Sequence, residues 1–443
     1  MSAATTTTPP PVLGGFTAAA FEAALASSAG APAWWLERKR AAYERFASLP
    51  MPRRNEEPWR FSHLAGLSLD FAPATAPAGP APTPAELPKF SPVASLEFSG
   101  NRLVRSQPLP PDLVRQGVVV TTLGEAARLH PQLLKAHFMA QPQKLGSEKF
   151  AALHTAFVED GAFIYVPRGV ALDQPIVVSH ASTGGPVFPH TLVVAEENSR
   201  ATVIDLFTSA LPAGAEASPQ FACGANDLYV GHGSDLTYVA VQDWSPTTLS
   251  FQLNSTVVRR DARVQSLNLH FGARQARHES LSQLQAPGAF SEMLALTVAR
   301  ATQEFDQRTL QLHQAPNTKS DLLYKNVLQD SARTIFSGLI IVDPDAQKTD
   351  AYQSNRNLVL SENAEANSLP GLEIQANDVR CTHGATTSRI DPEQEFYLRS
   401  RGLRREEAQE LLIFGFFEEA LNRLKSEEIH ATLRQLLESH LQK

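Results

Sequence analysis

Apolar residues follow two different patterns along the chain. In residues 16–48 and 122–140 they recur at helical spacing, as Trp35 and Phe46 do. From about residue 145 to residue 390, short runs rich in β-branched and aromatic residues are separated by Gly, Asn, Asp or Ser, which is typical of strands. The pattern therefore predicts a mainly β core between helical regions.

The change of pattern predicts three regions. We expect an N-terminal helical region over residues 1–144, a β core over residues 145–393 and a C-terminal helical region over residues 394–443. Residues 71–88 contain six prolines among Ala, Thr and Gly, which predicts an extended linker inside the first region.

Many short strands with hardly any helix between them allow a sandwich, a barrel, a propeller or a β-solenoid. Two features favour a solenoid: no amphipathic helix interrupts the β region, and it carries asparagines, such as Asn326 and Asn357, of the kind that stack between coils. The C-terminal helices carry apolar residues from Leu411 to Leu441. They either cap the open end of a solenoid or form a surface for a partner.

Composition narrows the classes of function. The chain has 39 Lys+Arg against 46 Asp+Glu, and no basic run is interleaved with aromatic residues, which disfavours nucleic-acid binding. The apolar segment Leu411–Phe417 is too short to span a membrane. Because the first basic residue is Arg38, the start of the chain lacks the charged region of a signal peptide. We expect a cytoplasmic protein.

One pair of residues suggests a site for a metal or an iron–sulfur centre. The chain has no P-loop, no H-E-x-x-H and no C-x-x-C, but Cys381 and His383 are two positions apart in an extended segment. Such residues project from the same face of a strand, and a thiolate with an imidazole suits zinc or an iron–sulfur centre. Arg380, next in sequence, would favour the thiolate. The alternatives are a structural Cys beside a hydrogen-bonded His, and nucleophilic catalysis, for which no third orienting group is evident.

Two other functions remain open from the residues alone. A β-helix enzyme acting on carbohydrate would need carboxylates in a groove, and Asp378 and Glu373 are candidates. A purely structural interaction subunit would leave the Cys–His pair inert.

Ordered blocks of residues occur between Ser320 and Leu403. The blocks are Ser320–Leu328, Ala332–Gly338, Thr349–Gln353, Asn355–Ser361, Leu372–Ile374, Cys381–Thr386 and Phe396–Leu403. This series resembles the SufB/SufD family of iron–sulfur cluster assembly scaffold proteins. The segment from Glu56 to Phe61 looks like the Glu–Trp motif of that family's N-terminal region, and the form of the Cys381 to Gly384 segment is most similar to the SufD branch.

The resemblance implies a right-handed parallel β-helix between the helical regions. It implies a non-catalytic scaffold in a SufBCD complex, paired with SufB through the β-helix, with the SufC ATPase received by the C-terminal helical region. It also allows a homodimer when the chain is alone, and implies neither nucleic acid nor membrane as a partner. We expect these residues to dock a partner: Phe396, Tyr397, Arg401, Gly402, Phe414, Phe416 and Phe417.

The number of available ligands points to a shared site. Iron–sulfur clusters are usually held by four thiolates, or by thiolates with histidines. This chain has two cysteines, Cys223 and Cys381, and only the second has a neighbouring histidine. We therefore expect a transient cluster or iron at the SufB–SufD interface, with His383 as the first candidate ligand and Cys381 as the second, and none tightly bound to the isolated chain. Movement of SufC driven by nucleotide would expose this interface.

Overall fold

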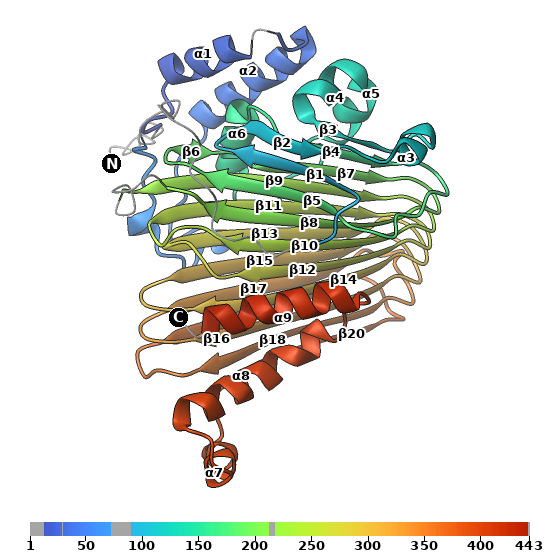
Figure 1. The fold of residues 1–443 in the computed structure, drawn as a ribbon. Helices are drawn as coiled ribbons and strands as arrows, with labels where there is room; N and C mark the ends of the chain where they lie inside the picture. Colours follow the sequence, from blue (N-terminus) through green and yellow to red (C-terminus); the bar gives the residue numbers. More distant parts are fainter. Residues whose placement is uncertain (1–12, 29, 72–89, 212–217, 442–443) are drawn as a thin grey trace, which may run out of the picture.

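A computed structural model shows a parallel β-helix with helices on its outer faces, and it describes residues 13–28, 30–71, 90–211 and 218–441 (Figure 1). The mainly β fold and the β-helix are confirmed. Except for Phe71, the predicted linker lies outside the described residues.

The strands form two sheets, and each coil of the β-helix contributes one strand to each. Sheet A contains β1 (Ala94–Ser99), β2 (Arg102–Gln107), β5 (Ile176–Ser182), β8 (Arg200–Ser209), β10 (Asp235–Asp243), β12 (Arg263–His270), β14 (Phe290–Ala299), β16 (Lys319–Leu328), β18 (Asp350–Val359) and β20 (Arg380–Ser388). Sheet B contains β3 (Val119–Thr122), β4 (Ala162–Val166), β6 (Pro186–Val187), β7 (His190–Ala195), β9 (Gln220–Val230), β11 (Thr248–Val258), β13 (Gln275–Leu284), β15 (Glu304–His313), β17 (Arg333–Val342) and β19 (Glu365–Ile374).

Helices lie before β1, between β2 and β4, and after β20. They are α1 (Ala18–Ser27), α2 (Ala33–Ser48), α3 (Pro111–Arg115), α4 (Leu123–Leu129), α5 (Pro131–His137), α6 (Glu148–Phe157), α7 (Pro392–Ser400), α8 (Arg405–Leu421) and α9 (Glu427–Leu441), with 3₁₀ turns η1 (Glu57–Trp59) and η2 (Leu64–Gly66). Strands β1, β2 and β3 lie before residue 145, and the region boundaries at residues 144 and 393 stay predictions. Within the described ranges, no helix combines the length and the apolar character needed to cross a bilayer.

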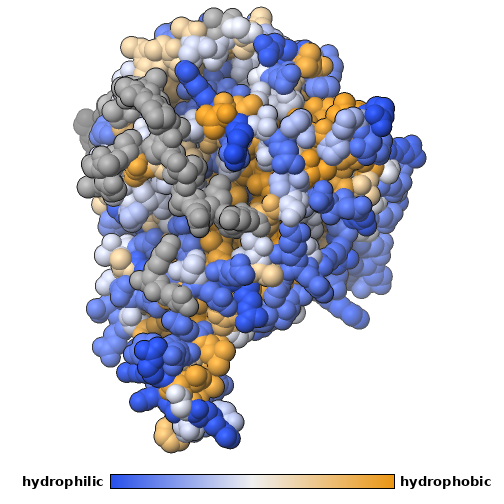
Figure 2. Space-filling model, viewed as in Figure 1, coloured by the Kyte–Doolittle hydropathy of each residue, from blue (hydrophilic) through white to orange (hydrophobic). Residues whose placement is uncertain are grey.

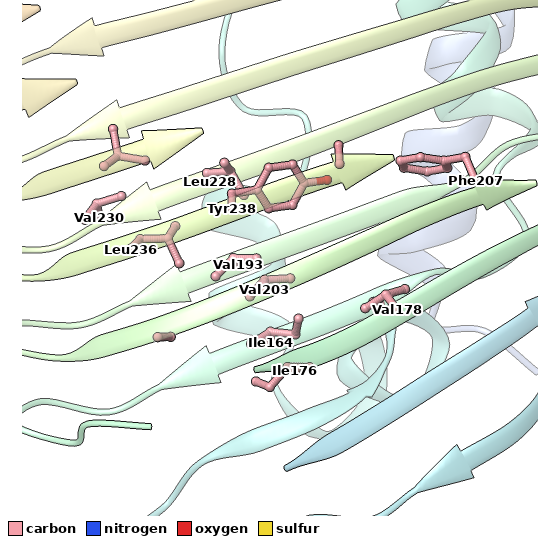
Figure 3. Close-up of a cluster of buried hydrophobic side chains, with 14 of the residues drawn as sticks. Ile164, Ile176, Val178, Val193, Val203, Phe207, Leu228, Val230, Leu236 and Tyr238 are labelled. Carbon is pink, nitrogen blue, oxygen red and sulfur yellow. The ribbon is translucent and has the colours of Figure 1, made fainter. Parts of the chain in front are cut away.

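Strand alternation builds a core inside the β-helix, which we call the lumen. On β10, Leu236 and Tyr238 point inward, whereas Val239 and Val241 point outward toward the C-terminal helices. Parallel register stacks like-facing residues of successive coils, so the inward side chains make continuous rows (Figure 3). Full burial of each aliphatic side chain contributes about 1.5–3 kcal/mol.

Polar rows also run through the lumen. Asn326 donates from Nδ2 to Oδ1 of Asn357 on the next coil at 2.9 Å, and Asn254 donates to Oγ of Ser280 at 3.2 Å. These bonds satisfy buried amides that would otherwise lose their water partners. The predicted stacking of Asn326 and Asn357 between coils is confirmed.

The coils turn from sheet B to sheet A through residues with a left-handed backbone. Asn198, Gly233, Asp261 and Gly288 all have φ between 53° and 77°, and each donates its N–H to a carbonyl in the turn of the next coil at 2.7–3.1 Å. Gly, Asn and Asp tolerate this conformation best, which explains their recurrence in the sequence. The Gly-His-Gly segment ending at Gly233 is one of these turns.

Helical segments cover the outer faces of both sheets. Helices α1, α2 and α6 pack on sheet B at its N-terminal end, where Trp35, Phe46 and Phe150 are buried. Helices α8 and α9 lie along the outer face of sheet A, and α7 projects beyond it (Figure 1). The interpretation that the C-terminal helices cap the open end is therefore wrong, since their apolar residues are taken up by a sheet face.

Candidate functional site

Cys381 and His383 lie on β20, the last strand of sheet A. Their register partners on β18 are Ala351 and Gln353, both buried residues of the lumen. Because side chains in register share a face, Cys381 and His383 project toward the lumen side at the end of the β-helix. The predicted common face of this pair is thus present in the structure.

The two side chains differ in environment. Cys381 is partly buried and packs in a small apolar cluster with Ala351, Leu372 and Val379. Burial raises the pKa of its thiol; a backbone hydrogen bond from Ala351 opposes this, and the charge of Asp350 adds to it. The expectation that Arg380 favours the thiolate is therefore wrong for the isolated chain.

His383 is exposed at the end of the lumen. The amide nitrogen of its register partner Gln353 is bonded elsewhere, because Nε2 donates to the backbone oxygens of Gly338 and Gly371 at 3.3 and 3.2 Å, whereas Oε1 is buried and accepts no hydrogen bond from the described residues. The imidazole is therefore accessible to a ligand or a partner from outside the coil.

Strand β20 has a free edge. Arg380 donates its N–H to Thr349 at 2.8 Å, so even-numbered residues of the strand bond toward β18. Alternation then directs the N–H groups of Cys381, His383 and Ala385 to the other side, where no described strand pairs with them. Such an edge can accept another strand.

The pair is an incomplete metal site. Among the residues that the structure describes, no group of three or more His, Cys, Asp or Glu could hold a metal ion. Cys223 is fully buried in β9, its thiol donates to the backbone oxygen of Phe150 at 3.4 Å, and burial raises its pKa. The structure therefore keeps Cys223 apart from the pair as an inert core residue.

The candidate carboxylates of a carbohydrate enzyme have local partners. Asp378 forms an ion pair with Lys348 in the turn before β20. Glu373, on β19, accepts a hydrogen bond from Gln375 at 2.9 Å. Both side chains are exposed at the open end of the β-helix.

The residues expected to dock a partner divide into two groups. On α7, Phe396 is 73% exposed and Tyr397 is 56% exposed, with the Arg401 guanidinium 5.2 Å from the Tyr397 ring. Gly402 follows with φ of 96°, which ends this helical segment. Figure 2 shows hydrophobic surface on this projection beside hydrophilic residues.

The second group lies on α8 and faces sheet A. Phe417 is fully buried, Phe414 is 9% exposed, and Phe416 is partly buried beneath the Lys325 ammonium, which lies 4.7 Å from its ring. Lys325 also donates to the Phe416 carbonyl at 2.6 Å. A partner would reach these side chains only if α8 left the sheet, and the docking assignment stays a prediction.

The sequence did not reveal that the Glu–Trp motif contacts a buried charged residue of sheet B. Trp59, from the Glu–Trp motif, is buried, donates to the Gly146 carbonyl at 3.0 Å and stacks on the guanidinium of Arg277 at 3.8 Å. The motif therefore fastens the N-terminal segment to the β-helix.

Comparison with known proteins matches both halves of the chain to one family. Residues 177–416 match the family model described as "SUF system FeS cluster assembly, SufBD core domain". Residues 28–178 match the family model described as "SufBD protein N-terminal region". The iron–sulfur cluster assembly protein SufD of Bacillus subtilis is 29% identical over 92% of this chain and 94% of its own length. SufD of Escherichia coli is 31% identical over 65% of this chain and 68% of its own length. Because the family model of the core domain alone matches more than half of the 443 residues, the chain belongs to the SufBD family of iron–sulfur cluster assembly proteins.

Proposed function

We propose that this chain is a non-catalytic scaffold subunit that pairs with a SufB-type paralogue through the open end of its β-helix. Iron or a nascent cluster, the cargo of the complex, would be held between the two chains. One observation carries the proposal: Cys381 and His383 project from the lumen face of a strand whose outer edge has no described partner.

The chemistry of Cys381 and His383 supports a site that is shared between two chains. One imidazole and one thiol leave a cluster short of ligands, which the paralogue would supply across the edge. His383 is exposed and so is the first ligand to meet incoming iron. Cys381 must lose a proton first, because burial raises the pKa of its thiol.

The test is anaerobic cluster reconstitution on this chain co-expressed with its SufB-type and SufC-type partners. We expect His383→Ala to lose most of the cluster absorbance and bound iron while the complex remains intact, because the variant removes a ligand but no packing. Thr382→Ala is the matched control, since Thr382 is exposed on the same strand and faces the opposite side.

Undiminished iron and absorbance in His383→Ala would show that the pair is structural. The chain would then act as scaffold alone, with every ligand supplied by the paralogue. A complex that failed to assemble would instead assign His383 to pairing, which size-exclusion chromatography distinguishes.

We also propose that the SufC-type ATPase docks on α7 and the adjoining start of α8. The exposed aromatic pair Phe396 and Tyr397 and the exposed Leu411 supply apolar contact area on a charged projection. Aromatic residues of this kind carry much of the energy of protein interfaces.

Replacing Phe396 and Tyr397 together by Ser should weaken ATPase binding at least about tenfold, since hot-spot residues cost about 2 kcal/mol or more when truncated. The measurement is isothermal titration of the ATPase into the chain. Val104→Ser is the control, because Val104 is 58% exposed on β2 at the other end of the molecule. Equal affinities for the double variant and the control would place the ATPase elsewhere.

A further inference from the structure

Each edge strand at the open end contains a glycine beside a large side chain of the preceding coil. A Cβ atom placed on Gly371 of β19 would lie 3.2 Å from Cδ1 of Leu339, and one on Gly384 of β20 would lie 3.9 Å from the hydroxyl of Tyr352. Neither glycine has a positive φ. These two positions therefore do not need the backbone freedom of glycine, and the effect of each glycine is to leave space where a side chain would otherwise lie.

On sheet B, the gap ends an apolar row. Leu281, Leu310 and Leu339 are successive register partners on the outer face, and the next partner is Gly371. Leu281 and Leu310 are buried, whereas Leu339 is only partly buried. The row therefore leaves Leu339 facing the open end without an apolar neighbour beyond it.

On sheet A, Tyr352 is in register with Thr382, but its hydroxyl extends diagonally toward Gly384, two residues along the edge strand. It is 39% exposed on the outer face of β18 and lies beside Gly384 of the edge strand. Within the described residues, its hydroxyl makes no hydrogen bond. Both sheets thus present one large side chain, from one coil back, across a gap in the edge strand.

We propose that Leu339 and Tyr352 are the contact residues, one on each sheet, for the chain that pairs with β19 and β20. This inference rests on the proposed function and names the residues that hold the partner in place. The partner continues both sheets and inserts an apolar side chain over Gly371 against Leu339, and a polar group or small side chain beside Gly384 against Tyr352.

The position of the two side chains favours this occupant. They lie on β17 and β18, one strand behind the free edges of β19 and β20. A strand added at either edge is therefore about 9.6 Å, or two interstrand spacings, from the strand that carries them, and its side chains reach them across the edge strand where that strand carries a glycine. The other end of the β-helix is protected differently, because β2 carries Arg102 and Arg105 and pairs with β1 across a bulge. Exposed apolar side chains at that end, including Leu103, are not beside an unprotected edge.

The test measures the affinity of this chain for its SufB-type paralogue by isothermal titration. Tyr352→Ser and Leu339→Asn should each weaken binding about tenfold or more, as expected for truncated anchors. Gly384→Val should weaken it similarly, since it fills the gap from which the partner contacts Tyr352. The matched control is Leu103→Asn, whose side chain is 37% exposed and which should bind as the wild type does.

Thermal unfolding of each isolated variant reports whether the fold is intact. Gly384→Val is the least disturbing, because the nearest atom to its new Cβ lies at ordinary contact distance. Weakened binding with an unchanged unfolding midpoint supports the inference. Wild-type affinity in Tyr352→Ser, Leu339→Asn and Gly384→Val overturns it.

Ala385→Pro separates this inference from the proposed pairing itself. It removes an N–H that faces the free edge and leaves the bonds to β18 in place. If Ala385→Pro abolishes pairing while the anchor variants bind normally, the edge is correct and the two contact residues are wrong. If Ala385→Pro and the anchor variants all pair as the wild type does, the partner does not use this end of the β-helix.

Discussion

Replacing Arg277 by Met should destabilise the protein by about 3–5 kcal/mol, because it breaks a buried ion cluster and leaves charges without partners. Arg277 lies on β13 and its side chain is 3% exposed. It bonds Glu279 at 2.7 Å and Asp306 at 2.5 Å, both of which are also buried. Burial opposes its charge, but Asp306 and Glu279 outweigh this and raise its pKa.

The same guanidinium joins the N-terminal segment to sheet B. It donates to the carbonyls of Pro58 and Leu145 at 2.9 and 2.7 Å and lies over the Trp59 ring. The variant should therefore loosen the segment around η1 as well as lower the global free energy of unfolding. Limited trypsin digestion near Arg53 and Arg60 reports the first effect, and urea unfolding reports the second.

Arg105→Met is the control for Arg277→Met. Arg105 pairs with Glu97 on the surface, and its side chain is 75% exposed, so the urea midpoint should not change. Equal urea midpoints for the two variants would show that the Arg277 cluster does not stabilise the fold, and equal trypsin digestion would show that it does not hold the N-terminal segment.

The protein should lose stability steeply as the pH falls below about 6.5. Burial lowers the pKa of six buried histidines: to about 4 for His154 and His313, to about 3 for His180 and His278, and well below the ordinary value for His190 and His270. A group whose folded pKa is depressed contributes stability above its unfolded pKa, and this is lost as the pH falls toward the folded pKa. The window therefore runs from about pH 6.5 down to about pH 4 for His154 and His313, and down to about pH 3 for His180 and His278.

Two buried acids oppose this trend. Burial raises the pKa of Asp205 and Asp227 to about 7, so their contribution is present at low pH and is lost as the pH rises through 7. Near pH 6, the protons that the six histidines take up on unfolding outnumber those that the two acids release by roughly three. The free energy of unfolding should therefore fall by about 4 kcal/mol for each unit by which the pH is lowered.

Urea unfolding at pH 7.5, 6.5 and 5.5 measures this dependence. His313→Gln should reduce the slope by about one proton, because His313 is buried and bonded to Thr318 and Ser320 at 2.7 and 2.8 Å. His63→Gln, at an exposed position, is the control and should keep the full slope. A free energy of unfolding that stays constant from pH 7.5 to 5.5 would contradict the prediction.

The sequence pattern predicted many of the strands, but it did not predict β9, β11, β13 or β15 of sheet B. The sequences of β13 and β15, QARHESLSQL and EFDQRTLQLH, show no run of β-branched residues, yet every residue in both strands is buried. Outward charges such as Arg277 are satisfied by the N-terminal segment, and inward groups such as Gln307 bond across the lumen to Thr297 at 2.8 Å. Burial of polar strands depends on partners distant in sequence, which periodicity cannot reveal.

By itself, the sequence determined the mainly β class, the strand-rich core, the family and the common face of Cys381 and His383, since each depends on local spacing or on ordered motifs. The tertiary structure decided the rest. Register placed the pair at an open end, packing turned α8 and α9 onto sheet A instead of across that end, and burial raised the pKa of Cys381. These outcomes depend on which surfaces meet, and contacts between residues far apart in sequence set them.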